Sequence, residues 1–229
     1  MDSQIGASIT GLQPPCSSIV LTYDDGPTED GTEAILKELD ARHATATFFV
    51  LLTRARRNPT LLHEILAAGH EVGLHGADHR RLTEHQPDAL QPILTGARAE
   101  LEDLTGVRIH WSRPPYGSQT EAVWRAQVAS GLVPVLWAVE CRDWMTLSLD
   151  EYMAPLRRQD LRGAIVLLHD GYADESDGAA DGPAPHVDRS LLTRSVLEEA
   201  DLCGLTVRSL GAGLDEAKPD YRIWLDEPS

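Results

Sequence analysis

The chain has 229 residues, with 20 Lys and Arg against 36 Asp and Glu, which gives a formal net charge of −16. Apolar residues make up 42% and charged residues 24%, a globular composition that argues against wholesale disorder. The negative charge disfavours nucleic acid and anionic membrane surfaces as partners, and no apolar run approaches the roughly 20 residues that cross a bilayer.

Apolar β-rich runs alternate with helical patterns along most of the chain. In the first half, we predict strands at 19–23, 45–52 and 70–74, and helices at 32–42, 59–69 and 87–104. In the second half, we predict strands at 108–112, 132–139, 164–168 and 205–210, and helices at 120–130, 150–159 and 190–202. Strand–helix alternation predicts a parallel sheet. Seven or so units predict an α/β fold with a closed or nearly closed barrel, and an open doubly wound sheet is the alternative.

We expect residues 1–229 to form a single domain, with its core at about 18–210. Residues 173–187 are rich in Gly, Pro and Asp, which predicts a mobile loop. The acidic tail 211–229 is expected to lie over the surface.

The N-terminal segment lacks the features of a secretory signal. Residues 1–36 contain no Lys or Arg, so either the chain is cytoplasmic or its export signal has been removed. Cys16, Cys141 and Cys203 are too few and too scattered for a disulfide framework, and their odd number leaves at least one free thiol. We expect them to be buried small hydrophobic residues.

Ionisable residues follow five of the predicted strands. They occur in the segments DDGP at 24–27, HGADH at 75–79, RPPYG at 113–117, ECRDW at 140–144 and LLHD at 167–170. Each segment alone has an ordinary explanation, such as a turn or a chance histidine spacing. Together they lie at strand C-termini, where parallel barrels and sheets build their active sites.

Three of these residues have the chemistry of metal ligands. His75 and His79 follow the same strand and can offer imidazole nitrogens to one ion, and Asp25 can add a carboxylate. Two His and one carboxylate leave positions open for water and substrate, as catalytic zinc requires. Asp24 is then the candidate base, with Arg113 as its ionic partner. His169, across the ring of strand ends, is the candidate acid.

The ordered segments TYDDG, HGADH, RPPYG, ECRDW and LLHD resemble the five motifs of the polysaccharide deacetylases, the NodB-homology domain of carbohydrate esterase family 4. The resemblance spans about residues 18–210. It implies a distorted (β/α)7-type barrel of parallel strands. It also implies metal-dependent hydrolysis of an N-acetyl, or sometimes O-acetyl, group on a sugar such as a chitin oligomer or a peptidoglycan fragment.

The resemblance assigns a role to each matching position. The base, the arginine that supports it and the acid are Asp24, Arg113 and His169. The implied metal is Zn²⁺, or another divalent cation such as Co²⁺, Ni²⁺ or Mn²⁺, and its ligands are Asp25, His75 and His79. The backbone N–H of Tyr116 binds the substrate and forms the oxyanion hole together with the metal, and Trp144 and Leu167 line the pocket for the acetyl methyl group.

Three positions depart from the family pattern. Tyr23 replaces the commoner Phe, and Gly76 replaces the usual Ser or Thr, so the hydroxyl that steadies the metal loop is absent. Glu140 occupies the first acidic position of the fourth motif. The carboxylate that orients His169 is therefore either Glu140 or Asp143.

Other functions are weighed against deacetylation of an amino sugar. The same machinery can serve a small cytoplasmic substrate, such as a glycoside, an antibiotic precursor or a cyclic amide. Two His and one carboxylate are also the triad of Fe(II) oxygenases, but those usually use antiparallel sheets and would leave Arg113 and His169 idle. A sugar-binding module without catalysis would stack sugar rings on tryptophan side chains. The chain has Trp111, Trp124, Trp137, Trp144 and Trp224, and we expect most of them to lie in the buried core instead. The expected partner is an acetylated amino sugar, with no nucleic acid and no membrane, and the sequence leaves the oligomeric state open.

Overall fold

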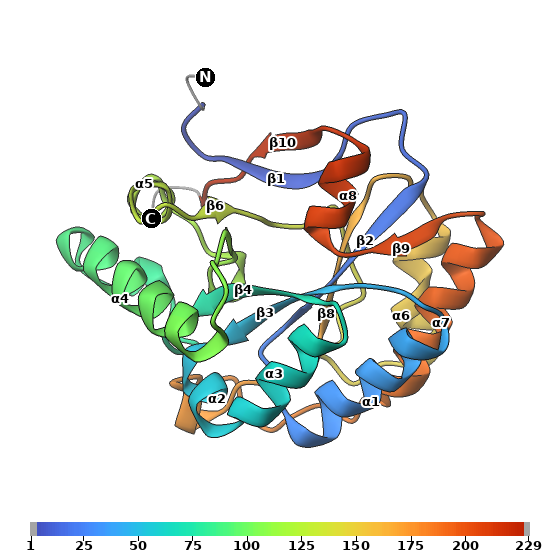
Figure 1. The fold of residues 1–229 in the computed structure, drawn as a ribbon, viewed down its shortest axis with the longest axis horizontal. Coiled ribbons are helices and arrows are strands. Elements are labelled where there is room, and N and C mark those ends of the chain that lie inside the picture. The colour runs from blue at the N-terminus through green and yellow to red at the C-terminus, as the bar shows by residue number, and fades with distance from the viewer. Residues whose placement is uncertain (1–3, 227–229) are drawn as a thin grey trace.

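A parallel β-sheet curls into a distorted barrel in the computed structural model, which describes residues 4–226 (Figure 1). Its strands pair in the order β6 (Val133–Pro134), β5 (Trp111–Ser112), β4 (Glu71–Gly76), β3 (Thr47–Leu51), β2 (Ser18–Asp24), β8 (Ile165–His169) and β7 (Val139–Glu140). A further strand, β9 (Thr206–Arg208), pairs with residues 18–20 of β2. β3 pairs with residues 22–24 of β2. The predicted α/β barrel is confirmed.

The barrel is irregular where a continuous strand is predicted at 132–139. That segment forms two short strands, of which β6 pairs with β5 and β7 pairs with β8. Between them, the Leu136 N–H turns aside to donate to the Ile9 carbonyl, 2.8 Å away. Pro134 has no N–H to donate, which also shortens the ladder at this point.

Helices cover the outer face of the sheet in an arc (Figure 1). Neighbours pack in the order α5 (Glu121–Ala129), α4 (Pro87–Thr105), α3 (Pro59–Ala67), α1 (Glu29–Ala41), α7 (Arg189–Leu202) and α6 (Leu149–Arg157). Helix α2 (Leu52–Arg57), which the sequence does not predict, follows β3 directly. Within residues 4–226, none of the helices combines the length and apolarity needed to span a bilayer.

Two apolar layers result from the alternation of side chains along the strands. In β2, Ile19, Leu21 and Tyr23 belong to the large cluster shared with the surrounding helices. Val20 faces the other way, into the cluster that fills the barrel. Asp24 ends the strand on the same face as Val20, so the alternation carries its carboxylate to the end of the barrel interior.

The two ends of the chain contain elements that the sequence does not predict. The N-terminal segment contains β1 (Ala7–Leu12), and the predicted surface tail begins with α8 (Leu210–Glu216) and β10 (Pro219–Ile223). Leu210, the last residue of the predicted core, is fully buried in the barrel cluster, and most of the tail residues that follow it are exposed or half-buried. β10 pairs antiparallel with β1, and this ribbon lies beside β6 and α5 (Figure 1). The last three residues of the predicted tail, 227–229, lie outside the described part of the chain.

The predicted mobile loop at 173–187 contains a short helix, η3 (Glu175–Asp177), that is tied to α2. The Asp177 carboxylate is fully buried and accepts hydrogen bonds from Thr53 Oγ1 at 2.9 Å and Arg54 Nε at 2.8 Å. Arg54 Nη2 also donates to the Tyr172 carbonyl at 2.6 Å. The first part of this loop is therefore anchored by a buried ion pair.

Replacing Asp177 with alanine is expected to lower the free energy of unfolding by about 3–5 kcal/mol, because the buried Arg54 guanidinium would lose its partner. Denaturant unfolding would measure the loss. Asp160→Ala is the control, since it breaks an ion pair with Arg162 that is exposed to solvent, and no measurable change is expected there. Equal stability of the Asp177 and Asp160 variants would contradict the anchoring role of Asp177.

Candidate active site

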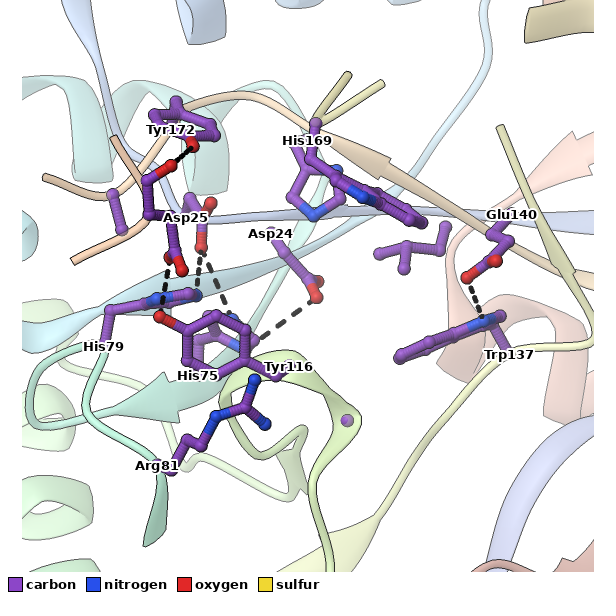
Figure 2. A pocket seen from close by; sticks show the side chains of 15 residues that line it. Asp24, Asp25, His75, His79, Arg81, Tyr116, Trp137, Glu140, His169 and Tyr172 are labelled. Atoms are coloured by element: carbon purple, nitrogen blue, oxygen red, sulfur yellow. Dashed lines mark hydrogen bonds and ion pairs between the residues drawn. The ribbon is translucent and has the colours of Figure 1, made fainter. Parts of the chain in front are cut away.

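A cavity of about 490 Å³ opens at the carboxyl ends of the barrel strands (Figure 2). Its walls include most of the residues that the motifs single out: Asp24, Asp25, His75, His79, Tyr116, Glu140, Trp144, Leu167 and His169. The predicted residues Arg113 and Asp143 lie directly behind this wall, each paired with a residue that lines it. The structure thus brings together every predicted site residue.

Asp25, His75 and His79 converge on one point. Asp25 Oδ1 lies 3.4 Å from His75 Nε2 and 3.2 Å from His79 Nε2, and all three side chains are buried. His75 Nδ1 donates to the Arg113 carbonyl at 2.9 Å, so its Nε2 is left as the unprotonated nitrogen when the ring is neutral. The imidazole lone pair and the carboxylate therefore face the same small volume.

This volume fits a divalent cation. One ligand atom from each of the three residues lies within 4.8 Å of the others. Asp25 Oδ1, which lies between the two imidazoles, is buried and has no hydrogen-bond partner among residues 4–226. Burial alone raises the pKa of Asp25, but the imidazoles of His75 and His79 hold it well below its usual value. An ionised carboxylate together with two imidazoles is a set of ligands that binds transition metals such as zinc.

The backbone around this site takes unusual conformations. Asp25 has φ 78°, a left-handed conformation that Asp tolerates better than most residues, and it turns the Asp25 side chain away from that of Asp24. Gly76 has φ 140°, and a Cβ there would lie 2.6 Å from the Asp78 carbonyl, so this chain has no room for the usual Ser or Thr. The metal loop is held instead by the His79 N–H, which donates to the Asp177 carbonyl at 2.7 Å.

Asp24 is paired with Arg113 inside the barrel. Arg113 Nη1 donates to Asp24 Oδ1 at 2.7 Å and to Thr22 Oγ1 at 2.9 Å. Arg113 is almost completely buried, and its remaining nitrogens donate to the carbonyls of Val135 and Leu136. Because Oδ1 is occupied by the guanidinium, Asp24 Oδ2 is the oxygen left to act in the cavity.

His169 is oriented by Asp143, not by Glu140. Its Nδ1 donates to Asp143 Oδ1 at 2.7 Å, and its backbone N–H donates to Asp143 Oδ2 at 2.9 Å. Burial lowers the pKa of His169, but the charge and hydrogen bond of Asp143, together with the negative charges of Asp25 and Asp24, raise it to about 9. His169 is therefore an imidazolium at neutral pH. Glu140 accepts a hydrogen bond from Trp137 Nε1 at 3.1 Å and forms part of the cavity wall.

Tyr116 lies beside His79 and Arg81 in the cavity (Figure 2). Its ring centroid is 4.4 Å from that of His79, and the Arg81 guanidinium stacks over it at 3.9 Å. Its hydroxyl donates to Asp181 Oδ2 at 2.6 Å. Tyr116 has φ 62°, so its backbone, like that of Asp25, is left-handed.

The remaining predicted wall residues are apolar. Trp144 packs edge-to-face on His169 with ring centroids 5.7 Å apart, and Leu167 is almost completely buried. Both line the cavity and leave it an apolar side next to the imidazolium. Of the other tryptophans, only Trp137 lines the cavity.

Several residues of the site are not predicted from the sequence. Arg81, Trp137, Tyr172 and Asp181 line the cavity without belonging to a predicted motif role. Arg189 lies behind it, where its guanidinium donates to the carbonyls of His169 and Gly171 at 2.5 and 2.6 Å and approaches Asp143 Oδ2 at 3.5 Å. These residues come from loops and from a helix start, where no periodic pattern marks a functional side chain.

The cysteines play no part in this chemistry. Cys16, Cys141 and Cys203 are all free, but only Cys141 is buried as predicted. Cys16 is half-buried, and Cys203 is exposed because it follows the last turn of α7. Burial raises the pKa of the Cys141 thiol well above its usual value, and Asp143 and Glu140 add to the effect. Cys141 is thus a packed thiol within the fourth motif, not a nucleophile.

Known proteins share both the sequence and the fold. A family model described as polysaccharide deacetylase matches residues 11–135. The chain is 36% identical over 156 residues to a chitooligosaccharide deacetylase of Bradyrhizobium sp. (strain ANU 289), covering 68% of this chain and 71% of that protein. It is 34% identical over 203 residues to a chitooligosaccharide deacetylase of Rhizobium leguminosarum bv. phaseoli, covering 86% and 89%. The structure of the peptidoglycan deacetylase PdaC from Bacillus subtilis superposes with a TM-score of 0.72 and 26% identity, covering 90% of this chain and 93% of PdaC.

Proposed function

The chain belongs to the polysaccharide deacetylase family, carbohydrate esterase family 4, and on that premise we propose that it removes the N-acetyl group from amino sugars of a chitin-type oligosaccharide. One observation carries the proposal: the Asp25–His75–His79 trio shares a cavity with Asp24, backed by Arg113, and with His169, backed by Asp143. The two rhizobial relatives named chitooligosaccharide deacetylases support the choice of substrate. The net charge of −16 also favours an uncharged glycan over an anionic polymer.

Hydrolysis of an acetamide needs an activated water, a place for negative charge on the carbonyl oxygen and a proton for the leaving nitrogen. A divalent cation held by Asp25, His75 and His79 would supply Lewis acidity toward water and the carbonyl oxygen. Asp24 Oδ2 takes the proton of the attacking water, while Arg113 holds the other carboxylate oxygen in place.

The other residues complete the reaction. The backbone N–H of Tyr116 donates to the oxygen that gains charge during attack. The His169 imidazolium gives its proton to the sugar nitrogen as the C–N bond breaks, so that acetate and a free amine leave. Trp144 and Leu167 provide the apolar side of the cavity for the acetyl methyl group.

Roles for Asp24, Arg113 and His169 also separate this proposal from an oxygenase. An Fe(II) oxygenase would use the two imidazoles and Asp25. It would leave the buried Asp24–Arg113 ion pair and the His169 imidazolium without a function. The alternative of a small substrate uses identical chemistry. Turnover of an N-acetylated monosaccharide, a chitin oligomer and a chitin polymer, measured side by side, distinguishes the two.

Acetate release from chitin oligomers is expected to require a metal. Treatment with a chelator should abolish release, and addition of Zn²⁺ or Co²⁺ should restore it. Since a ligand that binds only the folded chain stabilises it, metal at one hundred times its Kd should raise the free energy of unfolding by about 2.7 kcal/mol. Asp25→Asn is the control, because the metal should no longer raise its melting temperature. Undiminished acetate release after the metal has been removed would contradict the proposal.

A further inference from the structure

The turn at residues 116–119, here called the tyrosine loop, has a backbone that needs support. Tyr116 has φ 62° and Gly117 has φ 63°, so two consecutive residues are left-handed. Glycine adopts this conformation freely, but a residue with a Cβ does so only when its surroundings hold it there. The orientation of the Tyr116 N–H therefore depends on contacts made to this loop.

The C-terminal segment at residues 224–226, here called the C-terminal clamp, makes three such contacts. Trp224 Nε1 donates to the Gly117 carbonyl at 3.1 Å. Ser118 Oγ donates to Asp226 Oδ2 at 2.6 Å, and the Asp226 N–H donates to the Gln119 carbonyl at 2.8 Å. Each of the three residues that follow Tyr116 is thus bonded to a segment more than one hundred positions later in the chain.

Packing reinforces these bonds. The Trp224 ring lies edge-on against Trp137 with centroids 5.1 Å apart. Trp137 in turn covers Gly117, where a Cβ would lie 2.5 Å from the indole. Gln119 is fully buried, and its Nε2 donates to the Trp224 carbonyl at 2.7 Å. The clamp and the cavity wall therefore enclose Gly117 from two sides.

We propose that the C-terminal clamp positions the oxyanion donor of this enzyme, with Trp224 as the principal positioning residue. The inference rests on the proposed function, in which the Tyr116 N–H stabilises the charge on the carbonyl oxygen. Trp224 does not line the cavity and acts through Gly117, whose carbonyl it holds. The clamp lies beyond residues 11–135, which match the family model, so this support comes from a part of the chain outside the family match.

Two matched tryptophan variants test the proposal. Trp224→Phe keeps an aromatic ring and removes the indole donor. Trp124→Phe makes the same change in α5, where Nε1 donates to the Ala7 carbonyl at 3.0 Å, away from the cavity. If both lose similar thermal stability, Trp224→Phe should still lower kcat about five- to tenfold at unchanged KM, the factor expected for one hydrogen bond. Trp124→Phe should leave kcat near that of the native protein.

A readout independent of turnover accompanies the kinetics. Amide hydrogen exchange in the peptide that covers the tyrosine loop should accelerate in Trp224→Phe and not in Trp124→Phe, because the loop opens more often without its clamp. Two variants of Asp226 give a second comparison with a smaller expected effect. Asp226→Ala should lower kcat and speed amide exchange in the tyrosine loop. Asp226→Asn can still accept a hydrogen bond from Ser118, so its kcat and exchange rate should stay close to those of the native protein.

The outcomes separate this proposal from the proposed function. A native protein that releases no acetate from any amino sugar would overturn the function, and exchange in the tyrosine loop would still report on the clamp. An active native protein in which the Trp224 and Trp124 variants match in kcat and in exchange would overturn the clamp alone.

Discussion

Asp24→Asn is expected to lower kcat by about 10²–10⁴-fold, the contribution of a positioned general base, while leaving the metal bound. The substitution keeps the size of the side chain and a carbonyl oxygen that can accept from Arg113 Nη1. It removes the basic oxygen that faces the cavity, so substrate should bind with little change in KM. Steady-state kinetics and elemental analysis of the same preparation measure both effects.

Asp25→Asn makes the same chemical change one residue later, but we expect it to lose activity through loss of the metal. Asp25 Oδ1 lies between the two imidazoles, whereas Asp24 pairs with a guanidinium. Loss of its charge should lower metal content, and activity should recover partly at high metal concentration. If both variants lost metal equally, or if Asp24→Asn kept its turnover, the separation of base from ligand would be wrong.

The sequence predicts most of this site because of a topological rule. Parallel strands carry their carboxyl ends to one edge, so residues that follow β2, β4 and β8 must meet even though about 150 positions separate them in the chain. Side-chain alternation then places Asp24 inside the barrel. The approximate positions of the main helices follow from their periodicity and capping residues.

The choice between Glu140 and Asp143 needs the structure. Strand β7 ends at Glu140, and the chain then turns through Arg142, which has φ 57°. This left-handed residue breaks the regular alternation, so spacing alone does not tell which carboxylate reaches His169. The structure brings Asp143 to His169 and leaves Glu140 with Trp137.

Long-range contacts from irregular segments are also beyond the sequence. Asp181, Arg189 and Trp224 act on the site from a loop, a helix start and the end of a short ribbon. Their local sequences resemble any polar loop or any tail, because what matters is the partner on the other side of the fold. The same reason explains why the sequence predicts neither the helix and strand of the tail nor its contacts with the tyrosine loop.

The environments of Asp24 and His169 suit opposite proton transfers. A carboxylate paired with a buried guanidinium is ready to accept a proton, and an imidazole paired with a buried carboxylate is ready to donate one. The pKa of His169, raised to about 9, keeps the imidazolium populated at neutral pH. An alkaline limb in the pH profile of kcat/KM is therefore expected near pH 9, because activity is lost as His169 deprotonates.

Asp143→Asn should move that alkaline limb to lower pH. Removal of the negative charge leaves burial, which lowers the pKa of His169, without its main opposing influence. At pH 8 the imidazolium should then be scarce, and kcat/KM should fall about 10²-fold or more, as expected for loss of a general acid.

Glu140→Gln is the matched control for this shift. It removes a carboxylate from the same motif, but Glu140 bonds Trp137 and makes no hydrogen bond to His169. Its alkaline limb should stay close to that of the native protein. Since both variants lose one negative charge near the cavity, a general change in electrostatic potential would move both limbs alike. A shift confined to Asp143→Asn assigns the pKa of the acid to the 2.7 Å contact between Asp143 and His169, and equal shifts in both variants would contradict it.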